Sequence, residues 1–254
     1  MPKQSLRPLR VRQWRFVPIK TDEQLDMQSL HRVRERWVAR RTAIVNQIRG
    51  LLLERGITLR KGRRHVDAAL PEILEDATSK LSGALRILLA QLKLELDQMA
   101  MRIDEADAVL NKTAHENRAC QRLVAILGIG PVTATALIAA IGNGAAFRKG
   151  REFAAWMGVV PREHSTGGKQ KLLGISKRGN SYLRTLFIQG ARAVLQQCTK
   201  QASGLSAWLA QLTARTHRNV AAVALANKLA RIAWAVLAKN EPYRPPVQFS
   251  SAEA

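Results

Sequence analysis

The feature that most constrains this chain is a run of apolar residues whose spacing alternates between four and three positions. The run comprises Leu81, Leu85, Leu88, Leu92, Leu96, Met99, Ile103, Ala106 and Leu110. Residues at these steps lie on one side of an α-helix, so the run predicts one long helix with a continuous apolar stripe. Such a stripe requires a partner that covers it.

A second long helix is predicted upstream. Its apolar positions, with a gap at Arg40 and Arg41, are Leu30, Val33, Trp37, Ile44, Ile48 and Leu51. The polar connection between the two segments contains Gly56, Gly62 and Pro71. We therefore expect a long antiparallel coiled-coil hairpin over residues 21–116, formed within one chain or with the helices of another. An ordinary helical bundle is the alternative, because spacing alone does not identify a partner.

Beyond this hairpin, glycine divides the sequence into shorter helices. Apolar segments predict helices over 119–127, 131–141 and 151–157, then two longer ones over 182–197 and 207–239. The intervening stretch, residues 162–180, is rich in glycine and basic side chains and is expected to be a loop. No convincing strand pattern occurs, so the predicted fold class is all-α.

These patterns divide the chain into four parts. A basic N-terminal segment covers residues 1–20, the coiled-coil hairpin 21–116, and a C-terminal helical domain 117–240. Residues 241–254 contain three prolines and are expected to be a disordered tail. With 46% hydrophobic residues, the chain has enough apolar material for a sizeable core.

The charge of the chain indicates its partner. There are 41 Lys and Arg residues against 19 Asp and Glu, a formal net charge of +22. The excess is uneven: residues 31–64 are strongly basic, 67–107 are mainly acidic, and from 117 to 240 the only acids are Glu152 and Glu163. A charge of this size argues against a neutral metabolic enzyme and favours nucleic acid as the partner.

One uncharged stretch, residues 123–147, is long enough to span a bilayer. Gly128, Gly130 and Pro131 break it near its start and an Asn-Gly pair breaks it again, so we expect a buried pair of helices and no membrane partner. The basic N-terminus is not followed by the apolar segment of a secretory signal. Cys120 and Cys198 have no metal-binding spacing and suit a reducing cytosol, so a cytoplasmic location is expected.

The sequence Leu127-Gly128-Ile129-Gly130-Pro131, between two apolar helices, has the form of a helix-hairpin-helix element. Its glycines allow a tight turn, and the amides that start the next helix can bind a backbone phosphate without reading base sequence. A plain turn that uses glycine for its backbone freedom is the alternative. The basic surroundings favour phosphate contact at Gly128 and Gly130.

The segment from Pro161 to Lys171 carries the most chemical information. It places the hydroxyls of Ser165 and Thr166, and the imidazole of His164, among basic side chains and paired glycines. The candidate nucleic-acid-binding residues are Arg162, Gly167, Gly168, Lys169, Lys171, Lys177 and Arg178, with Arg184 adding further positive charge. A hydroxyl here could attack phosphorus if another group took its proton. From the residues alone, a phosphate-binding loop is favoured over a nucleophile, and His164 is kept as a candidate acid/base helper.

No metal site is predicted. The five histidines show neither pairing at four-residue spacing nor the carboxylate spacing typical of zinc. Two-metal phosphoryl transfer needs carboxylates that converge on the ions, and the basic C-terminal half offers only two acids. We therefore expect no cofactor in this chain.

Together the motifs resemble the insertion-sequence 110 and 1111 group of transposases. The first part of the resemblance lies in Arg15-Phe16-Val17-Pro18-Ile19-Lys20, Leu30-His31-Arg32-Val33-Arg34-Glu35-Arg36 and Asn46-Gln47-Ile48-Arg49-Gly50-Leu51-Leu52. The second lies in Ile126-Leu127-Gly128-Ile129-Gly130-Pro131, Phe153-Ala154, and the stretch from Gly158-Val159-Val160-Pro161-Arg162 to Gly174-Ile175-Ser176-Lys177-Arg178-Gly179-Asn180. The resemblance covers roughly residues 14–238, and the motifs are specific in combination.

The resemblance implies a DNA recombinase. Members of the group have an N-terminal RuvC-like domain with a DEDD set of carboxylates for Mg²⁺, a coiled coil used for assembly, and a C-terminal domain that supplies a serine nucleophile. Several use a structured guide RNA, which is therefore a further candidate partner, and the coiled coil implies a homo-oligomer. Carried onto this sequence, the nucleophile is Ser165; Thr166 is the alternative, since some relatives have the hydroxyl directly before the glycine.

The sequence departs from the group at its start, because the RuvC-like domain should precede Arg15 and residues 1–14 do not resemble it. We expect a truncated transposase that binds DNA and self-associates but is inactive alone in strand exchange, with Mg²⁺ needed only with the missing domain. Two alternatives remain: a non-enzymatic nucleic-acid-binding protein, and an inhibitor that disrupts oligomers of the full-length transposase.

Overall fold

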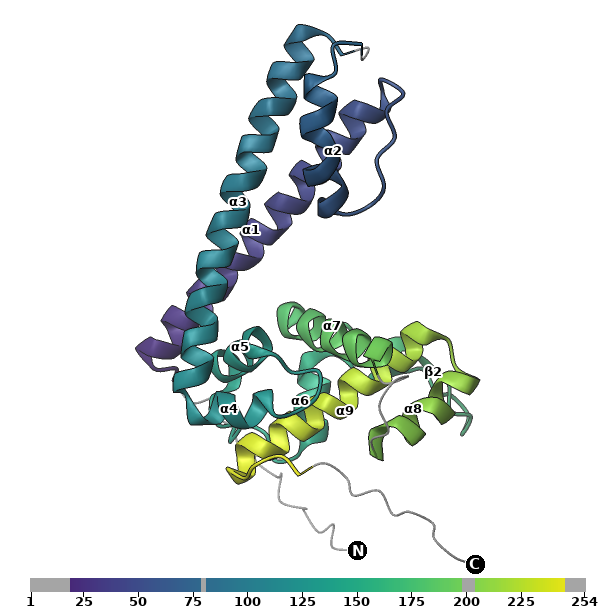
Figure 1. Ribbon diagram of the computed structural model, residues 1–254. Helices are drawn as coiled ribbons and strands as arrows, with labels where there is room; N and C mark the ends of the chain where they lie inside the picture. Colours follow the sequence, from purple (N-terminus) through teal and green to yellow (C-terminus); the bar gives the residue numbers. More distant parts are fainter. Residues whose placement is uncertain (1–18, 79–80, 198–203, 245–254) are drawn as a thin grey trace, which may run out of the picture.

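The computed structural model describes residues 19–78, 81–197 and 204–244, and there the chain is mostly helical (Figure 1). The helices are α1 Asp22–Leu53, α2 Arg63–Glu75, α3 Gly83–Glu116, α4 Arg118–Val124, α5 Pro131–Ile141, α6 Gly150–Met157, α7 Ser181–Gln197, α8 Gly204–Arg215 and α9 Arg218–Lys239. Two short strands are β1 Pro161–Glu163 and β2 Leu172–Ile175. Most of the predicted N-terminal segment and tail, and Cys198, lie outside the described residues.

Helices α1 and α3 pack side by side in opposite directions and form an arm that projects from the rest of the protein (Figure 1). Arg34, early in α1, pairs with Asp107, late in α3, whereas Arg40 pairs with Glu95. The two long helices predicted from the spacing are thus present, and they cover each other's stripes within one chain. Helix α1 begins at a capping box in which the Thr21 hydroxyl accepts the Gln24 amide.

The core of the arm contains Ile48, Leu52, Leu89 and Leu96, which are fully buried. The predicted stripe was wrong at Leu88, which is 53% exposed while its neighbour Leu89 is buried. The predicted stripe assumes about 3.5 residues per turn, whereas an α-helix has about 3.6, so the buried stripe drifts around α3 along its length.

Helix α2 was missed, because the sequence predicted only a polar connection. Its residues Val66 and Leu70, one turn apart, are fully buried against the arm. Pro71 lies inside this helix, where its missing amide normally favours a break. The burial of the Val66 and Leu70 side chains outweighs that preference here.

Helices α4 to α9 share a second core around Phe153, Phe187, Leu137 and Leu225. The uncharged stretch contributes the last two residues of α4 and the whole of α5, and both helices are too short to span a bilayer. Helix α9 is long and apolar enough to do so by length and composition, but half of its most apolar window is buried within the protein, as in a core helix.

One predicted helix, over 207–239, proved to be two. Helix α8 ends at Arg215, and α9 starts after His217, whose side chain Nδ1 accepts the Asn219 amide at 3.2 Å. This side-chain cap lets a new helix begin in a new direction.

Helices α3 and α4 meet at a single residue, Asn117. Its backbone amide donates to the Thr113 carbonyl and closes α3, while its side-chain Oδ1 accepts the amides of Ala119 and Cys120 at 2.9 and 3.1 Å and opens α4. The arm therefore joins the C-terminal helices without an intervening loop.

Candidate nucleic-acid interface

The prediction of a loop over the basic stretch 162–180 was wrong in one respect, because the stretch contains a β-hairpin. Strands β1 and β2 pair antiparallel, with Pro161 opposite Ile175 and Glu163 opposite Leu172. Towards the tip, the His164 amide donates to the Lys171 carbonyl at 2.9 Å, and the Lys169 amide donates to the Thr166 carbonyl at 3.1 Å. Residues 161–174 are all exposed, so both faces of the hairpin are open to a partner.

The tip of the hairpin is a two-residue turn at Gly167 and Gly168. Both have positive φ, +58° and +75°, which is the conformation of a type I′ turn. Only glycine enters this region freely, and the turn has the right-handed twist that paired strands need. The paired glycines could have predicted the hairpin, but the few β-branched residues around them gave no strand pattern.

Ser165 and Glu163 form a hydrogen-bonded pair on the hairpin. The Ser165 hydroxyl donates to Glu163 Oε1 at 2.6 Å, and the Lys171 amide donates to Ser165 Oγ at 3.2 Å. The carboxylate is positioned to take the hydroxyl proton, and the amide lies against the oxygen that would become negative. A nucleophilic hydroxyl that donates a hydrogen bond to a general base has this geometry.

The hairpin separates its two hydroxyls. Side chains alternate along paired strands, so Glu163 and Ser165 lie on one face. Thr166 lies on the other, and so do His164, Lys169 and Lys171, whereas Arg162 lies at the register irregularity between Pro161 and Glu163. Ser165 thus has a carboxylate partner, whereas Thr166 has the cations.

The remaining predicted cations follow β2, where the chain returns to α6. A Cβ on Gly179 would be 1.7 Å from the Trp156 carbonyl oxygen, so the backbones touch there. Lys177 has φ +55° and donates its amide to the Gly158 carbonyl, and Arg178 accepts from Arg184 Nη1 at 3.1 Å. Arg184 also donates to the Met157 carbonyl, so its guanidinium fixes this return segment.

The turn at Gly128 and Gly130 contacts different elements from the hairpin. Gly128 has φ +91°, and a Cβ there would be 2.7 Å from a methyl carbon of Val194 on α7 and 3.2 Å from Leu229 on α9. Close packing therefore accounts for Gly128. Gly130 is exposed and precedes α5, whose start has no side-chain cap.

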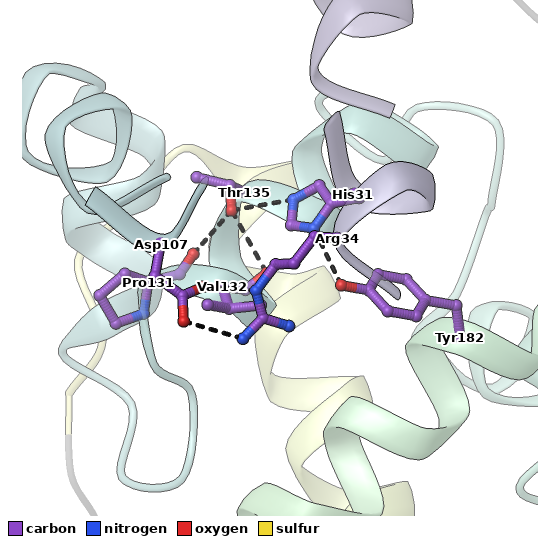
Figure 2. Close-up of polar contacts among 7 residues, drawn as sticks. All are labelled: His31, Arg34, Asp107, Pro131, Val132, Thr135 and Tyr182. Atoms are coloured by element: carbon purple, nitrogen blue, oxygen red, sulfur yellow. Dashed lines mark hydrogen bonds and ion pairs between the residues drawn. The ribbon is translucent and has the colours of Figure 1, made fainter. Parts of the chain in front are cut away.

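A buried polar network that the sequence did not predict joins the arm to the C-terminal helices (Figure 2). The Thr135 hydroxyl donates to the Pro131 carbonyl at 2.8 Å, so its oxygen accepts from His31 Nε2 at 3.1 Å. His31 Nδ1 then accepts from the Tyr182 hydroxyl at 3.0 Å. Helices α1, α5 and α7 are linked in this way.

Arg34 and Asp107 complete the network from the arm side. Arg34 Nη2 donates to Asp107 Oδ2 at 3.1 Å, and a second bond joins Nε to Oδ1. The hydrogen bond to Asp107 raises the pKa of Arg34 further. Burial, assisted by the Arg34 charge, lowers the pKa of His31 to about 4, so this histidine is neutral at pH 7.

Two comparisons identify the family. A family model described as "Transposase IS116/IS110/IS902 family" matches residues 120–207, which include the hairpin. A "Probable family 20 transposase" of Pseudomonas aeruginosa is 47% identical over 232 residues, which cover 91% of this chain and 69% of that protein. The chain belongs to this transposase family.

Two other transposases have similar identity. The transposase for insertion sequence element IS1111A of Coxiella burnetii is 44% identical over 230 residues, 91% of this chain and 63% of the relative. The transposase for IS1328 of Yersinia enterocolitica is 40% identical over 223 residues, 87% of this chain and 65% of the relative. The chain thus spans about two thirds of the length of these three transposases.

Proposed function

We propose that this chain supplies the DNA-binding part of an insertion-sequence transposase together with its nucleophile, the Ser165 hydroxyl. The observation that carries the proposal is the 2.6 Å hydrogen bond from Ser165 to Glu163 on an exposed hairpin. A serine hydroxyl needs a base before it can attack, and Glu163 lies within reach of its proton. The relatives named as transposases for insertion sequences support a reaction on DNA.

In the proposed step, Ser165 Oγ attacks the phosphorus of a DNA phosphodiester. A bond forms between Oγ and phosphorus, and the bond from phosphorus to one deoxyribose oxygen breaks. The hydroxyl proton passes to Glu163, and the departing oxygen takes a proton from water. One phosphate ester replaces another, so the DNA stays joined to the protein through phosphoserine without an external energy source.

Basic side chains of the hairpin hold the DNA backbone in this proposal. Arg162, Lys169 and Lys171 are exposed and carry the charge that a phosphate attracts. Thr166 is the alternative nucleophile, and its support is that it shares a face with Lys169 and Lys171. Ser165 depends on the carboxylate of Glu163, whereas Thr166 depends on nearby cations, so substituting each hydroxyl separately distinguishes the two candidates.

The family resemblance assigns Mg²⁺ to a RuvC-like domain. Among residues 19–78, 81–197 and 204–244, no three His, Cys, Asp or Glu side chains lie close enough to hold a metal ion. The described residues therefore do not fit the metal. We propose that strand exchange needs the RuvC-like domain and that this chain alone binds DNA and associates with other copies.

Self-association is supported by an apolar stripe on the outer side of α3. Ile87, Leu94 and Met101 are seven residues apart and 62%, 61% and 61% exposed. Seven-residue spacing places them on one side of the helix, opposite the buried Leu89 and Leu96. We propose that a second copy of α3 covers this stripe. A structured guide RNA is a further proposed partner, by resemblance alone.

The decisive experiment is a search for a covalent protein–DNA adduct. The purified chain, alone and mixed with the intact Pseudomonas relative, is incubated with a nicked suicide duplex and run on a denaturing gel. We expect an adduct of this chain that Ser165→Ala abolishes and Thr166→Val leaves in place. The reverse result would assign the nucleophile to Thr166.

The two alternatives, a nucleic-acid-binding protein and an inhibitor of the full-length transposase, predict different results in the same assays. DNA retention that weakens steeply with salt, without any adduct in either mixture, would leave a binding protein only. Loss of recombination by the intact relative, in proportion to the amount of this chain added, would favour the inhibitor. Failure to bind DNA at all would overturn the proposal.

A further inference from the structure

A second basic surface lies outside the hairpin, in a groove between the start of α6, helix α8 and the second half of α9. The groove has a volume of about 790 Å³. Its charged lining residues are Lys149, Arg151, Lys228 and Arg231. None of the sequence motifs pointed to it, because its cations come from three separate segments of the chain.

The cations of this groove have no carboxylate partner in the described part of the chain. Between residues 117 and 240 the only acids are Glu152 and Glu163. Glu152 Oε2 accepts the Arg148 amide at 2.8 Å, at the start of α6, and Glu163 accepts from Ser165. Four like charges around one groove repel each other, so an anion bound there lowers the free energy of the assembly.

The backbone of α6 adds to the positive potential. The amino end of this helix opens at Lys149 and Gly150, both of which line the groove, and it has no side-chain cap. A Cβ on Gly150 would be 3.1 Å from Trp234 and 3.2 Å from the Arg231 Cα. Glycine therefore lets the helix start lie directly against α9, next to Arg231.

One of the four cations is held in place by an aromatic ring. Lys228 Nζ lies 4.3 Å from the centre of the Trp208 ring, a cation–π contact between α9 and α8. The contact reduces the freedom of a long side chain before any ligand arrives. A preorganised ammonium group binds a phosphate at a lower entropic cost.

The groove is continuous with the base of the hairpin. A neighbouring cavity between the hairpin and α9, lined by Pro161, Leu173 and Val220, shares Ala224 and Asn227 with the cationic groove. Asn227 Nδ2 also donates to the Val159 carbonyl at 3.2 Å, which ties α9 to the start of the hairpin. A strand that contacts the hairpin can therefore pass over Ala224, a small residue, and enter the groove.

We infer that the groove of Lys149, Arg151, Lys228 and Arg231 binds the phosphodiester backbone of the DNA that the hairpin engages. This inference rests on the proposed function, because the hairpin must first hold DNA. It adds a second contact region to the same molecule of DNA. Backbone contacts of this kind fix the position of the duplex and carry no base specificity.

The test is a salt titration of DNA binding by the full chain, using fluorescence anisotropy with one random-sequence duplex. The groove variant is Lys228→Gln with Arg231→Gln. The matched control, which also removes two positive charges, is Arg215→Gln with Lys239→Gln; both residues are exposed and neither lines the groove. A third variant, Lys169→Gln with Lys171→Gln, tests the hairpin. Circular dichroism confirms that each variant folds.

Each phosphate contact contributes about 0.9 to the slope of log affinity against log salt. The slope is negative, and loss of the two contacts of Lys228 and Arg231 is expected to reduce its magnitude by about 1.8. The affinity of the groove variant should therefore fall far more at about 50 mM salt than at about 200 mM. The control should leave the slope unchanged.

The outcomes separate the inference from the proposed function. If the hairpin variant weakens DNA binding and the groove variant does not, the groove assignment is overturned and the proposed function stands. If neither the wild-type chain nor any variant binds DNA, both fall. If the groove variant loses affinity for a duplex RNA of the same length but keeps its affinity for DNA, the assignment to DNA is wrong.

Discussion

Gly190 on α7 lies directly against the carbonyl of Gly128, and a Cβ on Gly190 would be 2.0 Å from that oxygen. No rotamer change can relieve such a contact, because both atoms belong to backbones. Gly190→Ala should therefore destabilise the protein by about 1–3 kcal/mol, as overpacking does elsewhere. Urea unfolding followed by circular dichroism measures this.

A matched control is Gly50→Ala. Gly50 also lies within a helix, α1, but a Cβ there meets nothing within 4 Å. Alanine should stabilise that helix by about 0.5–1 kcal/mol. Equal effects of the two substitutions would show that helix propensity, and not the contact between the turn and α7, decides the result.

The buried His31 should make stability depend on pH. Its pKa is lowered to about 4 in the folded protein, whereas an unfolded histidine keeps its ordinary value of 6.5. The unfolded chain therefore takes up a proton first as the pH falls. The stabilisation is complete above pH 6.5 and is lost between pH 6.5 and 4, by up to about 3 kcal/mol. Urea unfolding across this range provides the measurement.

Two variants isolate this effect from the titration of acids. His31→Gln should remove the dependence between pH 6.5 and 5, although it also lowers stability at pH 7.5 because bonds to Thr135 and Tyr182 are lost. His65→Gln, at an exposed position of α2, should leave the profile as it is. A wild-type profile that is flat over this interval would contradict a neutral buried His31.

At Gly167 and Gly168, the cost of a substitution should depend only on how readily the new residue adopts a positive φ. No atom lies within 4 Å of a Cβ at either position, so strain alone decides. Gly167→Val should cost about 1–2 kcal/mol of hairpin stability, and Gly167→Asn much less. Hydrogen exchange of the His164 amide, which bonds to Lys171, reports on the hairpin. Equal protection in both variants would argue against a type I′ turn.

Glu163→Gln separates a catalytic role of the carboxylate from a purely electrostatic one. If Glu163 takes the Ser165 proton, the rate of adduct formation should fall by about 10²–10⁴-fold. DNA affinity should be unchanged or higher, since a negative charge is removed next to the phosphate. Gln170→Ala, on the same face of the hairpin, is the control. An adduct rate that follows DNA affinity would exclude the base.

The outer stripe of α3 should control the oligomeric state. Leu94→Glu with Met101→Glu places charges in the proposed contact and should reduce the mass measured by light scattering to that of one chain. The melting temperature of the chain itself should change little, because both side chains are already exposed. Leu53→Glu, at a residue 61% exposed on α1, is the control. A monomeric wild-type protein would disprove the contact.

The sequence predicted the helices that have strong periodicity. The spacing from Leu81 to Leu110 identified α3, and the glycines around Pro131 marked the start of α5. Helix α2 was missed because Pro71 and its polar neighbours resemble a connection, and only tertiary burial of Val66 and Leu70 reveals the helix. Local pattern carries no information about a partner that lies far along the chain.

The candidate site was predicted in part for a similar reason. Residue type and the glycine pair indicated Ser165 and Thr166 as candidates, but only strand pairing separates them onto two faces. The His31 network and the cationic groove each combine residues from helices far apart in sequence. Neither has a local motif, so neither could be found before the fold was known.

The shared cap at Asn117 has a mechanical consequence. Helix α3 is about 50 Å long, and Asn117 is the only residue between it and α4. A small rotation at this residue therefore moves the far end of the arm through a large distance. The hydrogen bonds of His31 to Thr135 on α5 and to Tyr182 on α7 oppose that rotation at the base of the arm. In the proposed association of copies through their arms, a displacement of one arm would therefore be transmitted to the C-terminal helices through the single junction at Asn117.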